Sequence, residues 1–137
     1  MRRLGITVVL SFVVLPVPGI HAWQAAQKLE YDAFCKLPDV ETKRSAFLAT
    51  SAESRTELAR TQVERWRDAN RGRLNEKQLA ALAELIAAFG PDTYADGAKG
   101  EEARAKIRPL AEKQRQLFAQ DELSAMQPYG PCIAKVK

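Results

Sequence analysis

The fold class of this chain is decided by residues 74–91, which read LNEKQLAALAELIAAFGP. Asn75 and Gln78 have the spacing of a capping box, in which each side chain bonds the backbone N–H of the other residue. Gly90 and Pro91 end the pattern, because glycine favours the position after a helix and proline cannot continue one. The apolar residues between them recur every three or four positions and predict one buried helical stripe: Leu79, Leu82, Leu85, Ile86 and Phe89.

The rest of the chain also has a helical composition. Alanine, leucine, glutamate, glutamine, lysine and arginine dominate, and no proline occurs between Pro38 and Pro91. The apolar spacing predicts further helices over residues 23–35, 39–48, 51–70 and 101–120, with one last turn after them. We therefore expect an all-α fold, a small bundle of about four to six short helices with one disulfide.

Polar residues and a proline mark the expected helix ends. Asp39 is a predicted N-cap, and Asp121 is the expected cap of the last turn. Thr50 and Glu53 fit a capping box. Pro109 lies inside the last long helix and is expected to kink it or split it. Two sets of apolar residues are expected to face the core: Leu58, Ala59, Val63 and Trp66 in one helix, and Ile107, Leu110, Ala111, Leu117 and Phe118 in another.

The N-terminus has the pattern of an export signal. Arg2 and Arg3 precede an uncharged apolar run over residues 4–15, and Ala22 is a small residue at the cleavage position. The run is shorter than the roughly 20 apolar residues that span a bilayer. We expect residues 1–22 to be a signal peptide and the protein to be exported, either periplasmic or secreted. An uncleaved membrane anchor is the alternative.

Residues 23–137 would then form a single helical domain with a short irregular C-terminal tail. Removal of Arg2 and Arg3 leaves 19 of the 21 basic residues and all 17 acidic ones, which gives a net charge of +2. So small a charge does not indicate a nucleic-acid partner. The only histidine, His21, lies in the signal, so the mature domain has no imidazole for catalysis or metal binding.

The mature domain has two cysteines, Cys35 and Cys132. An even pair in an oxidising compartment predicts a disulfide, and only one intramolecular pairing is possible. The bridge would tie the first helix to the C-terminal tail. A reactive thiol or an intermolecular bridge is the alternative.

A group of cations close in sequence surrounds Trp66. We expect a solvated helix end here, because cations suit the C-terminus of a helix. The alternative is a surface for an anionic partner, either anionic lipid, lipopolysaccharide or an acidic protein. The group consists of Arg65, Arg67, Arg71, Arg73 and Lys77.

No residues are spaced for catalysis or for a cofactor. Glu101 and Glu102 are adjacent and so point to different sides of a helix, and no phosphate-loop or dinucleotide motif occurs. Residues 92–97 resemble the start of a calcium loop, but Tyr94 and Ala103 stand where oxygen ligands are needed. We expect a protein that is not an enzyme and has no cofactor or metal.

Two resemblances bear on function. The first depends on a set of residues spread over the first part of the expected domain: Tyr31, Phe34, Leu37, Pro38, Arg44, Phe47, Leu48, Leu58, Trp66, Leu74, Gln78, Leu82 and Tyr94. In these residues the chain resembles bacterial proteins described as fulvocin C-related bacteriocins, which implies a secreted antibacterial polypeptide. Proteins of that kind are rich in cysteine, and this chain departs from them in having two cysteines.

The segment from Leu74 to Gln78 is similar to the Leu-Thr-x-x-Gln motif of periplasmic stress chaperones of the Spy and CpxP kind, with Asn75 in place of threonine. That similarity implies a helical, dimeric binder of unfolded proteins. Our first hypothesis is an exported binding protein without enzymatic activity. The alternatives are a periplasmic chaperone or stress adaptor and a protein that binds a membrane surface.

Overall fold

The computed structural model describes residues 28–136, which form six α-helices and no strand. One short 3-10 helix, η2, follows the second-longest helix. The fold is therefore all-α, as the sequence predicts. The elements are α3 (Tyr31–Cys35), α4 (Val40–Ala49), α5 (Ala52–Asn70), η2 (Arg71–Arg73), α6 (Glu76–Ala88), α7 (Gly97–Leu117) and α8 (Gln120–Ala125).

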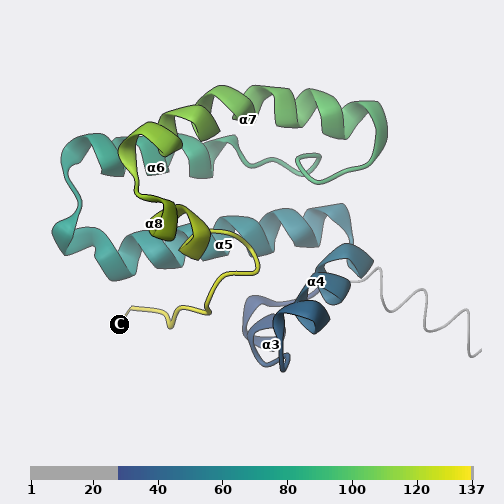
Figure 1. Ribbon diagram of the computed structural model, residues 1–137. Coiled ribbons are helices and arrows are strands. Elements are labelled where there is room, and N and C mark those ends of the chain that lie inside the picture. The colour runs from purple at the N-terminus through teal and green to yellow at the C-terminus, as the bar shows by residue number, and fades with distance from the viewer. Residues whose placement is uncertain (1–27, 137) are drawn as a thin grey trace, which may run out of the picture.

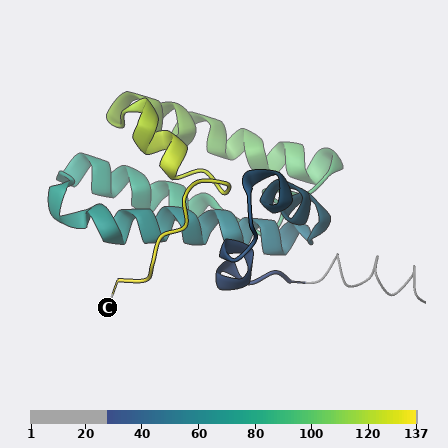
Figure 2. The same cartoon turned by 60° about the horizontal axis from the view of Figure 1, so that its bottom comes forward.

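The three longest helices form the body of the fold (Figure 1). α6 lies between α5 and α7 and packs on both of them. α3 and α4 lie beside the N-terminal end of α5, and α8 turns back from α7 towards α5. The C-terminal tail then crosses α5, as the view in Figure 2 shows.

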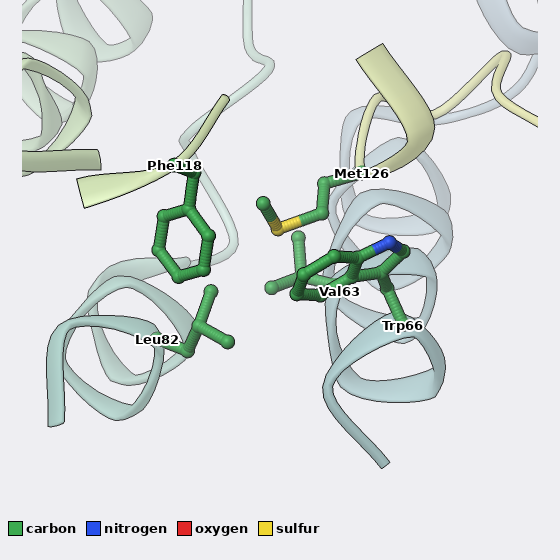
Figure 3. Close-up of a cluster of buried hydrophobic side chains, with 5 residues drawn as sticks. All are labelled: Val63, Trp66, Leu82, Phe118 and Met126. Carbon is green, nitrogen blue, oxygen red and sulfur yellow. The ribbon is translucent and has the colours of Figure 1, made fainter. Parts of the chain in front are cut away.

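The main core lies where α5 and α6 meet the C-terminal ends of α7 and α8 (Figure 3). Leu82 is fully buried, and the ring of Trp66 meets that of Phe118 edge to face at 5.7 Å between centroids. Met126 reaches into the same cluster from the end of α8. Burial of Trp66 confirms that it belongs to the core, and the predicted α5 stripe is buried throughout: Leu58, Ala59, Val63 and Trp66.

A second, aromatic cluster joins α3 and α4 to α5. Phe47 is its centre, because its ring lies 5.4 Å from that of Tyr94 and 5.3 Å from that of Tyr129. Phe34 and Leu58 are also buried in this cluster. The cluster therefore brings the loop before α7 and the C-terminal tail against the N-terminal helices.

The first helix is shorter than expected. Residues 28–30 are not helical, and α3 begins at Tyr31, whereas residues 23–27 lie outside the described residues. The backbone of Leu29 bonds the side chain of Ser54, with Leu29 N–H donating at 2.7 Å. This pairing ties Leu29 to the first turn of α5, so a contact distant in sequence overrides the local helical pattern.

The predicted N-caps Asp39 and Asn75 are confirmed, and the predicted cap at Thr50 is wrong. The Asp39 side chain accepts from the backbone of Thr42, and Asn75 and Gln78 form the full capping box. At α5 the cap is Ser51, whose hydroxyl accepts from the N–H of Ser54 at 3.1 Å.

The end of α6 departs from the expected glycine geometry. Gly90 follows the C-cap residue Phe89, but it does not take the left-handed conformation. Its N–H donates to the hydroxyl of Thr93 at 2.9 Å instead. The chain leaves the helix because Phe89 itself turns to an extended conformation.

The last long helix starts earlier and ends earlier than expected, and it is not split. α7 begins at Gly97, whose φ of +76° suits glycine, and it passes through Pro109 without a break. α8 is not capped by Asp121. Glu122 closes its first turn instead, because its Oε1 accepts from the N–H of Ala119 at 2.9 Å.

The tail after residue 126 is irregular, as expected. The predicted signal at residues 1–22 and the terminal Lys137 lie outside the described residues. Within the described part of the chain, no helix has both the length and the apolar character needed to cross a membrane.

Candidate functional site

The predicted disulfide between Cys35 and Cys132 is present, with their Cα atoms 5.8 Å apart. It joins the end of α3 to the C-terminal tail across 97 positions of sequence. The ammonium of Lys43 lies 3.6 Å from the Cys132 sulfur. No described cysteine is free, so the part of the chain described offers no thiol nucleophile.

A buried glutamine also holds the tail, beside the bridge. The side chain of Gln62 is 1% exposed and donates to the carbonyls of Ala125 and Pro131, at 2.8 and 2.9 Å. Its carbonyl oxygen accepts from the hydroxyl of Tyr31 at 2.5 Å. The same hydroxyl accepts from the N–H of Ile133 at 3.1 Å. Sequence reasoning missed this network because its members are far apart in the chain.

Arg65 of the predicted cationic group is turned into the fold. Its Nη1 donates to the carbonyl of Ile133 at 3.0 Å, and its guanidinium lies 4.7 Å from the centre of the Tyr31 ring. Its side chain is 19% exposed and lies 3.8 Å from a carboxylate oxygen of Asp32. Arg65 thus fastens the tail to α3 and α5.

The other four cations of that group surround the turn after α5. Arg67 and Arg71 both pair with Asp68, at 3.0 and 3.4 Å. Burial acts to raise the pKa of Asp68, but its hydrogen bonds and charge interactions with these two arginines lower it overall. Arg73 pairs with Glu122 at 2.8 Å and lies over the Trp66 ring. Lys77 is exposed and forms no ion pair within residues 28–136.

A groove of about 510 Å³ lies between α7 and α8. We call it the α7 groove. Its volume is within the range of small-molecule sites, roughly 300–1,000 Å³. Side chains of α5, α6 and α8 form its apolar floor and far wall, among them Ala59, Val63, Leu85, Phe89, Leu123 and Met126.

The near wall of the groove is the inner face of α7. Ile107 and Ala111 line it and are only partly buried, although the sequence predicts that they face a closed core. α7 buries only Gly100 and Gln114 completely. The helix packs along α6, but α8 is too short to cover the remaining apolar stripe, so that stripe faces the groove.

Three arginines of α7 border the groove: Arg104, Arg108 and Arg115. Arg104 has a structural role, since its Nη1 donates to the carbonyls of Thr93 and Ala95 at 3.2 and 2.9 Å. Arg108 is 67% exposed, and its nearest acid, Glu101, is 3.9 Å away. Arg115 pairs with Glu112 one turn earlier on α7. No aspartate or glutamate is among the residues that line the groove in the described chain.

Two polar residues complete the lining. The amide of Gln114 donates to the carbonyl of Ala81 at 2.9 Å, and its buried Oε1 has no hydrogen-bond partner in the described residues. Tyr94 lies at the end of the groove beside α7. Burial, reinforced by the neighbouring Tyr129, raises the pKa of Tyr94 to about 12. Its hydroxyl is therefore neutral at physiological pH.

The loop at this end of the groove is held from both sides. Arg55 of α5 donates to the carbonyl of Tyr94 at 2.9 Å, while Arg104 of α7 bonds the carbonyls on either side of it. The loop is therefore anchored to two helices.

A signal for the groove was present in the sequence, since the arginines at positions 104, 108 and 115 fall along the edge of the apolar stripe of α7.

Within residues 28–136, no group of three or more His, Cys, Asp and Glu side chains is arranged to hold a metal ion. The α7 groove is therefore the best-formed candidate site on the described chain, an apolar hollow with a cationic border. No family model, no curated protein and no solved structure matches this chain.

Proposed function

We propose that this chain is an exported protein without enzymatic activity that binds an apolar ligand in the α7 groove. The observation that carries the proposal is the open apolar stripe of α7. Ile107 and Ala111 are left partly exposed beside Leu123 and Met126, so a ligand placed there would remove apolar surface from water.

The structural frame supports a binding role. The groove is formed by four helices, and the loop at its end is fixed by Arg55 and Arg104. The disulfide between Cys35 and Cys132 fastens the tail to α3. A site on fixed elements loses little conformational entropy when it takes up a ligand.

The proposal is tested with 1-N-phenylnaphthylamine, a neutral dye whose emission rises in apolar surroundings. We expect the purified, oxidised protein to bind the dye with a saturable rise in emission. The variant Ala111→Trp fills the groove from the α7 wall and should abolish that rise. The matched control is Ala105→Trp, because Ala105 is exposed on α7 and does not line the groove.

Two results would contradict the proposal. The first is the absence of saturable dye binding by the wild-type protein. The second is equal binding by the Ala111→Trp variant, which would place the dye elsewhere. Suppression of client aggregation at near-stoichiometric ratios, without dye binding in the groove, would favour the chaperone hypothesis instead.

A further inference from the structure

We infer that the ligand of the α7 groove is a single-chain amphiphile with a carboxylate head, and that Arg108 binds this head. The inference rests on the proposed function and specifies its ligand. It combines the apolar lining of the groove with the sign of every charge on its border.

The charges of the groove are complementary to an anion. Each charged residue in its lining is an arginine of α7: Arg104, Arg108 and Arg115. A guanidinium presents several N–H donors in a plane, and a carboxylate can accept two of them side by side. A neutral apolar ligand would use only the apolar part of the site, whereas a fatty-acid-like ligand would use the arginine border as well.

Arg108 is the arginine with the most donor capacity to spare. Arg104 already donates to two backbone carbonyls, and Arg115 is in close contact with Glu112. Arg108 is 67% exposed, and its ion pair with Glu101 is 3.9 Å long between groups that are both exposed. Ion pairs between two exposed groups contribute little to stability, so a ligand carboxylate can replace this one.

The position of Gln114 also directs the head group towards Arg108. The buried Oε1 of Gln114 is an acceptor without a partner in the described residues, and a carboxylate beside it would be repelled. Arg108 lies six positions before Gln114 on α7, which corresponds to about 9 Å along the helix axis. The alkyl chain would then lie along Ile107, Ala111 and Leu123, with the head at Arg108.

The size of the groove favours one alkyl chain. Its volume of about 510 Å³ is that of a site for one small molecule. A ligand with a single chain of medium length fits this description better than a lipid with two chains. We therefore choose dodecanoate as the probe and dodecanol, which has the same chain and no charge, as its comparison.

The experiment measures displacement of 1-N-phenylnaphthylamine from the oxidised protein by each of the two probes. We expect dodecanoate to bind about fivefold more tightly than dodecanol, a difference of ~1 kcal/mol, and the advantage to shrink as salt rises. Arg108→Gln should remove the advantage of dodecanoate and leave dodecanol unchanged. Lys106→Gln is the matched control, because Lys106 is exposed on the same helix and does not line the groove.

The outcomes separate the two proposals. Equal binding of dodecanoate and dodecanol to the wild-type protein would overturn the inference and leave the groove as an apolar site. An advantage of dodecanoate that survives in Arg108→Gln, or that is lost equally in Lys106→Gln, would also overturn it. Failure of the dye and of both probes to bind would remove the proposed function itself.

Discussion

The hydroxyl of Tyr31 donates a 2.5 Å hydrogen bond to the side-chain oxygen of Gln62, and both residues are buried. The bond joins α3 to the middle of α5. Because Gln62 also bonds Ala125 and Pro131, one side chain connects the start, the middle and the end of the described chain. The side chain of Gln62 thus links α3, α5, α8 and the tail.

Removal of the Tyr31 hydroxyl should destabilise the protein. Tyr31→Phe leaves the buried oxygen of Gln62 and the N–H of Ile133 without their partner, which we expect to lower the free energy of unfolding by about 1–3 kcal/mol. Urea denaturation of the oxidised protein measures the change. Tyr129→Phe is the control, since the ring contacts of Tyr129 with Phe47 and Arg44 do not need its hydroxyl. Equal stability of the two variants would contradict the role of the network.

Loss of the disulfide should have a larger effect. The bridge closes a loop with a sequence separation of 97, and the chain-entropy model gives a stabilisation of about 4–5 kcal/mol for a loop of this length. The double variant Cys35→Ser with Cys132→Ser should lose most of this stabilisation, and so should the wild-type protein in reductant. Reductant should not change the urea midpoint of the double variant. Equal urea midpoints for the oxidised and reduced wild-type protein would refute the prediction.

Gly100 and Gly72 should respond in opposite ways to alanine. A Cβ on Gly100 would lie 1.7 Å from the carbonyl oxygen of Ala95, so Gly100→Ala forces the start of α7 away from its loop. We expect a loss of about 1–3 kcal/mol, although alanine is normally the better helix former.

Gly72 provides the comparison for that substitution. A Cβ on Gly72 would meet no atom within 4 Å, and the residue has no positive φ, so Gly72→Ala should be neutral or stabilise by up to about 1 kcal/mol. Thermal unfolding followed by circular dichroism measures both variants. Stabilisation by Gly100→Ala would show that α7 does not approach Ala95 as described.

Stability should fall in alkaline solution because of Tyr94. Burial raises the pKa of Tyr94 from 10.0 to about 12, so between these values the unfolded chain releases a proton that the folded chain keeps. The stabilisation is complete below pH 10 and is lost as the pH rises through 12. At the midpoint of this window the expected loss is about 1 kcal/mol.

The comparison that isolates Tyr94 is the variant Tyr94→Phe. The urea midpoint is measured at neutral pH and at about pH 11. The drop between these two pH values should be smaller in this variant than in the wild-type protein, because the variant lacks Tyr94 and keeps the other tyrosines. An identical alkaline loss in the two proteins would assign the effect to other groups.

Local patterns in the sequence determined the helical class and some of the helix ends. The capping box of Asn75 and Gln78, the cap at Asp39 and the buried stripe of α5 depend on residues a few positions apart, and they appear in the structure as predicted. The disulfide was also predictable, because two cysteines allow a single pairing within one chain.

Tertiary structure decided the rest, because it depends on contacts between distant residues. Leu29 is not helical since Ser54 bonds its backbone, and Arg65 faces the tail rather than solvent since it bonds Ile133. The sequence predicts that Ile107 and Ala111 are apolar positions on one face of α7, yet it cannot tell whether that face is covered. The short α8 leaves it open, and the candidate site exists for that reason.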